Sequence, residues 1–153
     1  MRPNDEMIAA LNLLLDRLLK DTKASRVTIR LDVPSRGFHV DSVVAEAVAT
    51  GVKSLKGDSS INQRQAATVK WLERERRLLV QDDLSKADPA PPPALVAVYE
   101  TKAQMLGPLI KGDHVFGWIS VHYNEGPRQW TRREITALER AVTQAYREIG
   151  PIS

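Results

Sequence analysis

Residues 103–123 (AQMLGPLIKGDHVFGWISVHY) contain two apolar segments separated by Lys111-Gly112-Asp113, a pattern that predicts a β-hairpin. The Gly-Asp dipeptide suits a two-residue turn because glycine adopts a positive φ without steric cost. Since successive side chains of a strand point to opposite faces, the second strand presents two sets of residues. One set is Val115, Gly117, Ile119, Val121 and Tyr123, and the other is Phe116, Trp118, Ser120 and His122. Both sets are largely apolar, so we expect a central hairpin that is covered on both faces.

The two faces of this second strand differ in polarity. The second set has two aromatic side chains followed by Ser120 and His122, whereas the first is almost wholly apolar. Polar groups inside an apolar wall cost free energy unless they are hydrogen bonded. This face is therefore predicted to form the wall of a partly hydrated cavity. The alternative is that Ser120 and His122 bond only to each other, to nearby backbone or to water.

Helical periodicity marks both ends of the chain. In residues 1–23, apolar positions recur at three- and four-residue spacing behind a possible cap at Asn4 or Asp5, which predicts an amphipathic helix. Residues 131–149 begin with a capping box, Thr131-Arg-Arg-Glu134, and end before Gly150-Pro151. The apolar seam of this second helix consists of Ile135, Leu138, Val142, Ala145 and Ile149. Such a seam is typical of a helix that meets a partner helix, although it could equally cover the sheet.

The middle of the chain is predicted to alternate between strands and helices. Residues 25–32 read as a strand with Val27, Ile29 and Leu31 directed inward. The further expected elements are a short strand at 38–40, a helix from Asp41 through Val48, a helix from a Ser60–Gln63 capping box to about Arg76, a strand at 77–84 and a short helix within 95–102. Residues 85–94 are rich in proline and favour extended geometry. Because neither side could close a core separately, this segment is expected to be a surface connection within one domain, 1–153.

Composition removes several classes of function. The chain has no cysteine, which excludes disulfides, thiolate catalysis, zinc–thiolate sites and thioether-linked cofactors. No apolar run is long enough to span a membrane and no signal-peptide pattern is present, so we expect a cytoplasmic protein. The net charge is only +3, and the densest basic run, residues 70–77, is interleaved with glutamates. That run indicates a solvated helix face rather than a nucleic-acid site.

Taken together, these elements resemble a GAF domain, a sensory module related to PAS domains, over essentially the whole chain. The resemblance is carried by residues 106–123, by Trp130-Thr-Arg-Arg-Glu134 and by Leu79-Val-Gln-Asp-Asp83. It implies an α+β fold with a central antiparallel β-sheet. The N- and C-terminal helices would lie on one face, with a ligand-type pocket and short helices on the other. It also implies a homodimer formed through the terminal helices.

The resemblance places the pocket on the same face that the alternation selects. It implies ligand-binding roles for Trp118, Ser120 and His122, with Gln104 and Leu106 on the neighbouring strand. The remaining expected wall residues are Phe116, Trp71, Asp83, Gln63 and Ala67. Since Arg30, Arg36 and Arg64 lie near plausible walls, an anionic group on the ligand is a reasonable guess.

Departures from the family pattern restrict the cofactor. Methionine-sulfoxide reductase activity and thioether-bound bilins both need cysteine, which is absent. The Asn-Lys-x-x-Phe and Asp-Glu pattern of the cyclic-nucleotide-binding members is also absent. A haem would need an axial histidine, for which the candidates are His39, His114 and His122. No cofactor is assigned.

Three functions remain open at this stage. The leading one is a non-enzymatic sensor that binds an unidentified small cytosolic molecule and signals through a homodimer to a separate output protein. The second is a structural adaptor whose pocket is filled. The third is an enzyme using Asp82 or Asp83 with His122 as acid and base, although no nucleophile–base–orienter arrangement can be assembled from the spacing.

Overall fold

The sheet is the centre of the molecule. The computed structural model describes residues 3–152, in which five strands form one antiparallel sheet of order β2-β1-β5-β4-β3. The strands are β1 Arg26–Leu31, β2 Val43–Val48, β3 Leu79–Gln81, β4 Ala103–Lys111 and β5 His114–Tyr123. The predicted hairpin is confirmed: β4 and β5 join through Gly112, whose φ is 59°, and Asp113.

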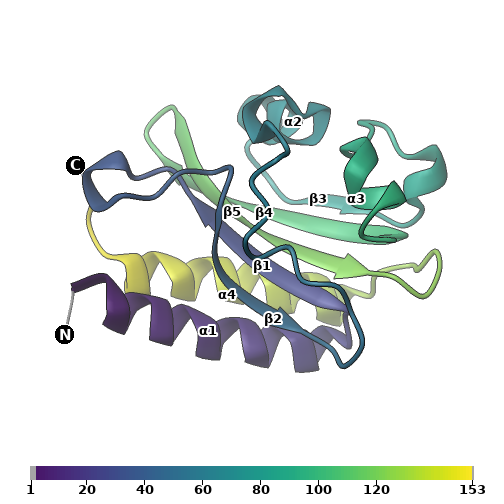
Figure 1. The fold of residues 1–153 in the computed structure, drawn as a ribbon, viewed down its shortest axis with the longest axis horizontal. Coiled ribbons are helices and arrows are strands. Elements are labelled where there is room, and N and C mark those ends of the chain that lie inside the picture. The colour runs from purple at the N-terminus through teal and green to yellow at the C-terminus, as the bar shows by residue number, and fades with distance from the viewer. Residues whose placement is uncertain (1–2, 153) are drawn as a thin grey trace.

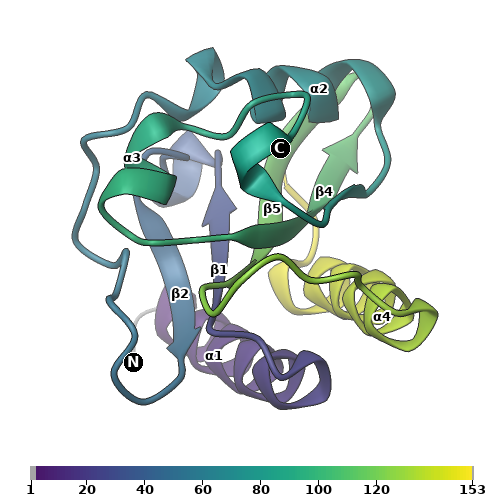
Figure 2. The same ribbon diagram turned by 90° about the vertical axis from the view of Figure 1, so that its right-hand side faces the viewer.

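Helices cover both faces of this sheet. α1 (Pro3–Thr22) and α4 (Arg132–Ile149) lie side by side on one face, and α2 (Ala67–Glu75) and α3 (Pro93–Ala97) lie on the other (Figures 1 and 2). The predicted α+β arrangement, with both end helices on one face, is therefore confirmed. The core between the end helices and the sheet includes Leu11, Leu15, Val27, Ile29, Met105, Ile119 and Leu138, all fully buried.

The predicted capping box at the start of α4 is also present. The Thr131 side chain accepts a hydrogen bond from the Glu134 backbone N–H (3.2 Å), and the Glu134 carboxylate accepts one from the Thr131 N–H (2.8 Å). These two bonds satisfy donors that the first helical turn leaves without partners. At the other end the helix stops at Gly150, whose positive φ of 72° ends the helical path.

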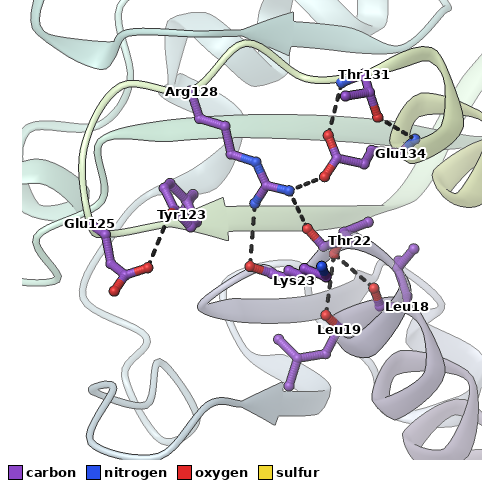
Figure 3. A network of polar contacts seen from close by, with 9 residues as sticks. All are labelled: Leu18, Leu19, Thr22, Lys23, Tyr123, Glu125, Arg128, Thr131 and Glu134. Carbon is purple, nitrogen blue, oxygen red and sulfur yellow. Dashed lines mark hydrogen bonds and ion pairs between the residues drawn. The ribbon is translucent and has the colours of Figure 1, made fainter.

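Arg128, in the loop before α4, contacts α1, β5 and α4 at the same time (Figure 3). Its guanidinium donates to the backbone oxygens of Thr22 and Lys23 at the end of α1 and pairs with Glu134. The same group lies over the rings of Tyr123 and Trp130, 4.6 and 4.5 Å from their centroids. The contacts fix the ends of α1 and β5 against the start of α4.

Two helix predictions in the middle of the chain need correction. Residues 43–48 form the edge strand β2 rather than a helix, and they pair antiparallel with β1. The long helix expected from Ser60 begins only at Ala67. Its expected capping box does not form, because the Gln63 N–H donates to Asp41 and the Ser60 N–H donates to Asp58.

Smaller differences concern the short elements. The predicted strand at 38–40 is reduced to one bridge between Val33 and Phe38. The strand expected at 77–84 is confined to β3, while the short helix expected within 95–102 is α3 and starts at Pro93. Within residues 3–152, no helix is both long enough and apolar enough to cross a membrane.

Candidate functional site

A small hollow lies on the sheet face opposite α1 and α4. Its volume is about 30 Å³, and its floor is formed by side chains of β1, β4 and β5. The polar residues along it are Thr28, Arg30, Gln63, Thr68, Gln104, Ser120 and His122. Leu106 and Trp118 form part of the apolar wall, and Trp118 is almost completely buried. A space of this size holds about two water molecules, so side chains fill most of the pocket.

Strand register brings these side chains together. Thr28 on β1 lies opposite Ser120 on β5, which in turn lies opposite Leu106 on β4. One row along, His122 pairs with both Arg26 and Gln104. Because residues paired across neighbouring strands project to the same face, a single register places all three strands' polar groups around one space.

His122 is held as a neutral imidazole. The ring is 3% exposed, and its Nδ1 accepts a hydrogen bond from Arg26 Nε at 3.1 Å. Burial, followed by the nearby charges of Arg26 and Arg30, holds the His122 pKa well below its usual value of 6.5. A guanidinium nitrogen can only donate, so Nδ1 must be unprotonated and the ring proton lies on Nε2.

Arg26 fixes this histidine from a fully buried position. Its other nitrogens donate to the Lys53 carbonyl and to Thr101 Oγ1, both at 2.7 Å, and its guanidinium lies 5.5 Å from the Tyr99 ring centroid. Burial lowers the pKa of Arg26 to about 10, which the more distant charge of Glu46 only partly offsets. Arg26 is therefore a structural cation bound by neutral acceptors.

Arg30 borders the hollow itself. It is 4% exposed and donates one hydrogen bond, from Nη1 to the Val40 carbonyl at 3.0 Å. Burial lowers its pKa, against the opposing charges of Asp41, Asp58 and Glu46. Within residues 3–152, neither Arg26 nor Arg30 has a carboxylate at ion-pair distance. The pocket side of the sheet thus contains two buried positive charges without paired carboxylates.

Residues 49–66, which connect β2 to α2, cover the hollow, and Arg64 holds this cover in place. This guanidinium donates to Asp32 (2.8 Å), Glu73 (3.1 Å) and the Val115 carbonyl (3.0 Å). It also lies 5.8 Å from the centroid of the Trp118 ring. The cover is therefore attached to β5, to α2 and to the residue that follows β1.

Five of the residues expected at the pocket lie together around the hollow: Gln104, Leu106, Trp118, Ser120 and His122. Gln63 also borders it, whereas Ala67 is exposed at the start of α2. Gln104 is positioned by its amide, which donates to Gln81 Oε1 at 2.8 Å.

Phe116 was expected on the pocket wall, and this prediction is wrong. Leu109 lies opposite Gly117 and Ile110 lies opposite Val115, so Phe116 is the extra residue of a β-bulge. The bulge turns Phe116 into the core beneath the end helices, where its ring meets Tyr146 of α4 edge to face at 6.1 Å. Val115 takes the pocket side instead and packs in the same cluster as Trp118.

Trp71 and Asp83 also lie away from the hollow. Trp71 packs on the outside of the cluster around Trp118, with the Arg77 guanidinium 5.0 Å from its ring centroid. The Asp83 carboxylate accepts hydrogen bonds from the Ser85 N–H (3.0 Å) and hydroxyl (2.7 Å), which lower its pKa. Asp83 therefore caps a turn, and it does not form an acid–base pair with the buried His122.

The three arginines suggested for an anionic ligand separate in the structure. Arg30 borders the hollow and Arg64 pins its cover, whereas Arg36 donates to the Ile149 carbonyl (2.9 Å) at the end of α4. Arg26 and Thr28 were not singled out by the sequence. The available signal was their polar character on the outward face of the strand at 25–32, whose inward face is apolar.

Metal ligands do not gather in the described part of the chain. No group of three or more histidine, cysteine, aspartate or glutamate side chains there could hold a metal ion. Of the three candidate haem ligands, only His122 borders the hollow, while His39 and His114 are exposed.

The fold and pocket position define a class of protein. The model of the GAF domain family matches residues 6–149, so the chain belongs to the GAF family. Among curated proteins, none matches the chain in sequence.

Similar solved structures come from photoreceptors. The cyanobacteriochrome receptor PixJ is 22% identical with a TM-score of 0.73, covering 93% of each chain. The PixJ GAF domain of Thermosynechococcus elongatus is 21% identical, with a TM-score of 0.72 over 94% of this chain and 87% of that one. A phycocyanobilin-bound GAF domain from a cyanobacterial phytochrome is 17% identical, with a TM-score of 0.72 over 94% and 84%. At these identities the likeness shows the shared fold.

Proposed function

We propose that this domain is a non-enzymatic sensor that binds a small cytosolic molecule in the hollow between the sheet and its cover. The observation that carries the proposal is the hollow itself, in which polar side chains from three strands meet around a small, partly open space. The proposed ligand-contacting residues are Gln104, Leu106, Trp118, Ser120 and His122. The absence of cysteine agrees with a reducing compartment such as the cytoplasm.

A bilin does not fit this pocket. The hollow of about 30 Å³ is roughly a tenth of the smallest usual ligand site, which starts near 300 Å³. The sequence also lacks the cysteine that a thioether link requires. The ligand is therefore expected to be much smaller than the chromophore of the photoreceptor relatives.

Ligand binding is testable through stability. A molecule that binds only the folded state raises the free energy of unfolding by RT ln(1 + [L]/Kd), about 2.7 kcal/mol at a hundredfold excess over Kd. We expect at least one compound in a library of small metabolites to raise the melting temperature. The same compound should shift the indole N–H signal of Trp118 in ¹⁵N NMR spectra and leave that of Trp130 unchanged, with a Trp118→Phe variant assigning the signals.

The small volume of the hollow favours one competing function, a structural adaptor whose pocket is filled. In that case no compound would change the melting temperature, or a stabilising compound would leave the Trp118 signal in place. Either result would count against the sensor.

We also propose that the domain signals through its terminal helices as a homodimer, with α1 forming the contact, to a separate output protein. The seam of α4 is unavailable for this contact, because Leu138, Ala145 and Ile149 are buried against the protein's own sheet and α1. The exposed side of α1 offers Leu13, which is 72% exposed. The dimer contact is therefore centred on Leu13.

A further inference from the structure

Arg30 is the charged side chain on the wall of the hollow, and most of its hydrogen-bonding capacity is unused. A guanidinium has five N–H groups. In the described part of the chain, only one hydrogen bond from Arg30 is formed, to the Val40 carbonyl. The residue is 4% exposed, so little of the guanidinium is open to bulk water, and it lines the hollow.

Three carboxylates, those of Asp41, Asp58 and Glu46, act electrostatically on Arg30, and all three are hydrogen bonded to other groups. Asp41 accepts the Gln63 N–H at 3.0 Å, and Asp58 accepts from Ser60 (2.6 and 2.8 Å) and from the Tyr99 hydroxyl. Glu46 accepts the Leu55 N–H at 2.8 Å and the Ser54 hydroxyl. A buried charge is normally paired within the protein, and this one is not.

The groups beside Arg30 in the hollow can also donate. Thr28 and Ser120 lie opposite each other in the β1–β5 register, both are buried, and neither hydroxyl bonds to another residue within 3–152. His122 has its proton on Nε2, as its bond from Arg26 requires. A charged donor surrounded by neutral donors provides the complement of an anion.

We propose that the hollow binds a small monocarboxylate, of the size of formate or acetate, with Arg30 as its counter-charge and Thr28 and Ser120 as further donors. The proposal rests on the sensor function proposed above and names the chemical class of its ligand. A planar carboxylate matches the planar fork of a guanidinium. The hollow of about 30 Å³ limits the ligand to a few heavy atoms. The bound anion would replace the missing carboxylate.

The test uses the full chain with sodium acetate and sodium formate as probes, at constant ionic strength set with sodium chloride. Acetamide, which has nearly the same shape without the charge, is the matched neutral compound. We expect acetate or formate to raise the melting temperature and to shift the Trp118 indole signal, while acetamide and chloride do neither. Equal effects of acetate and acetamide would overturn the proposal.

Variants assign the effect to Arg30. Arg30→Met, which keeps an unbranched apolar stem and removes the guanidinium, should weaken acetate binding by at least about tenfold. Arg140→Met makes the same change at an exposed site on α4 and should leave the affinity unchanged. A folded Arg30→Met variant that binds acetate as tightly as the original chain would refute the assignment. If Arg30→Met does not fold, Thr28→Val and Ser120→Ala test the proposal instead. Each is expected to weaken acetate binding severalfold. A variant of either kind with unchanged affinity would contradict the proposal.

The ligand class and the sensor function can fail separately. If a neutral metabolite or inorganic phosphate shifts the Trp118 signal and the small carboxylates do not, the hollow is a binding site and the carboxylate assignment is wrong. If no compound shifts that signal, the sensor function itself is wrong.

Discussion

At the scale of single residues, the pocket side of the sheet brings together charged and polar side chains from distant parts of the chain. Arg26 and His122 form a buried donor–acceptor pair across two strands, 96 positions apart in the chain. The hydrogen bond needs a neutral imidazole, and burial favours the same state. Protonation of His122 would therefore destabilise the folded structure.

The free energy of unfolding should therefore depend on pH. In the unfolded chain His122 takes up a proton near its ordinary pKa of 6.5, whereas in the folded protein its pKa is well below that value. The unfolded state then binds more protons below pH 6.5, so the free energy of unfolding should fall as the pH falls. The slope from this group approaches about 1.4 kcal/mol per pH unit.

Urea unfolding at several pH values between 5 and 7.5 measures this slope. His122→Gln should flatten the pH dependence in this window, because residue 122 then no longer takes up a proton. His39→Gln, at an exposed position, is the matched control and should retain the slope. A slope unchanged in His122→Gln would mean that another group titrates.

At the scale of elements, local signals were sufficient for the hairpin and for both end helices. The capping box of α4 and the Gly-Asp turn are decided by neighbours in sequence, and both form as expected. The sequence pattern predicts a helix at residues 43–48, because a short apolar run does not distinguish helix from strand. Their pairing with β1, which is distant in sequence, decides the outcome.

The prediction that Phe116 lies on the pocket wall is wrong for a related reason. Alternation assigns faces correctly only while the strand stays in register, and one extra residue reverses the assignment beyond it. Trp118, Ser120 and His122 lie after the bulge and face the hollow, whereas Phe116 is the bulged residue. The bulge is specified by contacts between strands, and so the sequence pattern did not reveal it.

Two glycines in the central strands give a direct test of this packing. A Cβ at Gly117 would lie 2.4 Å from the Arg30 carbonyl oxygen and 2.9 Å from a Leu31 methyl. A Cβ at Gly107 would meet mainly side-chain atoms of α4, the nearest being Val142 Cγ2 at 2.7 Å. Side chains can move aside more easily than backbone, so Gly117→Ala should be the costlier change.

Chemical denaturation compares the two variants. We expect Gly117→Ala to lower the free energy of unfolding by about 2–3 kcal/mol and Gly107→Ala by about 1 kcal/mol. The reverse order would mean that β1 and β5 adjust at the bulge more easily than α4 adjusts against β4.

At the scale of the whole molecule, the sheet separates the proposed ligand site from the helices that would transmit its occupancy. α1 and α4 cover one face of the sheet (Figure 2). The hollow lies on the opposite face. Both helices are attached at one end by Arg128, which also contacts Tyr123 at the end of β5 (Figure 3). The strand that carries Ser120 and His122 thus continues directly into the junction of the end helices.

Transmission to a second copy would then depend on the outer surface of α1. Replacing Leu13 by glutamate adds a charge at the proposed centre of the dimer contact, and burying an unpaired charge there costs several kcal/mol. The side chain is exposed within one protomer, so the fold itself should tolerate the change. Light scattering at micromolar concentration should show a dimer for the original chain and a monomer for Leu13→Glu. Val98→Glu changes an exposed aliphatic residue just after α3, on the opposite side of the sheet, and should remain dimeric. A monomeric original chain, or dimers of equal stability in both variants, would remove Leu13 from the contact and with it the proposed route of the signal.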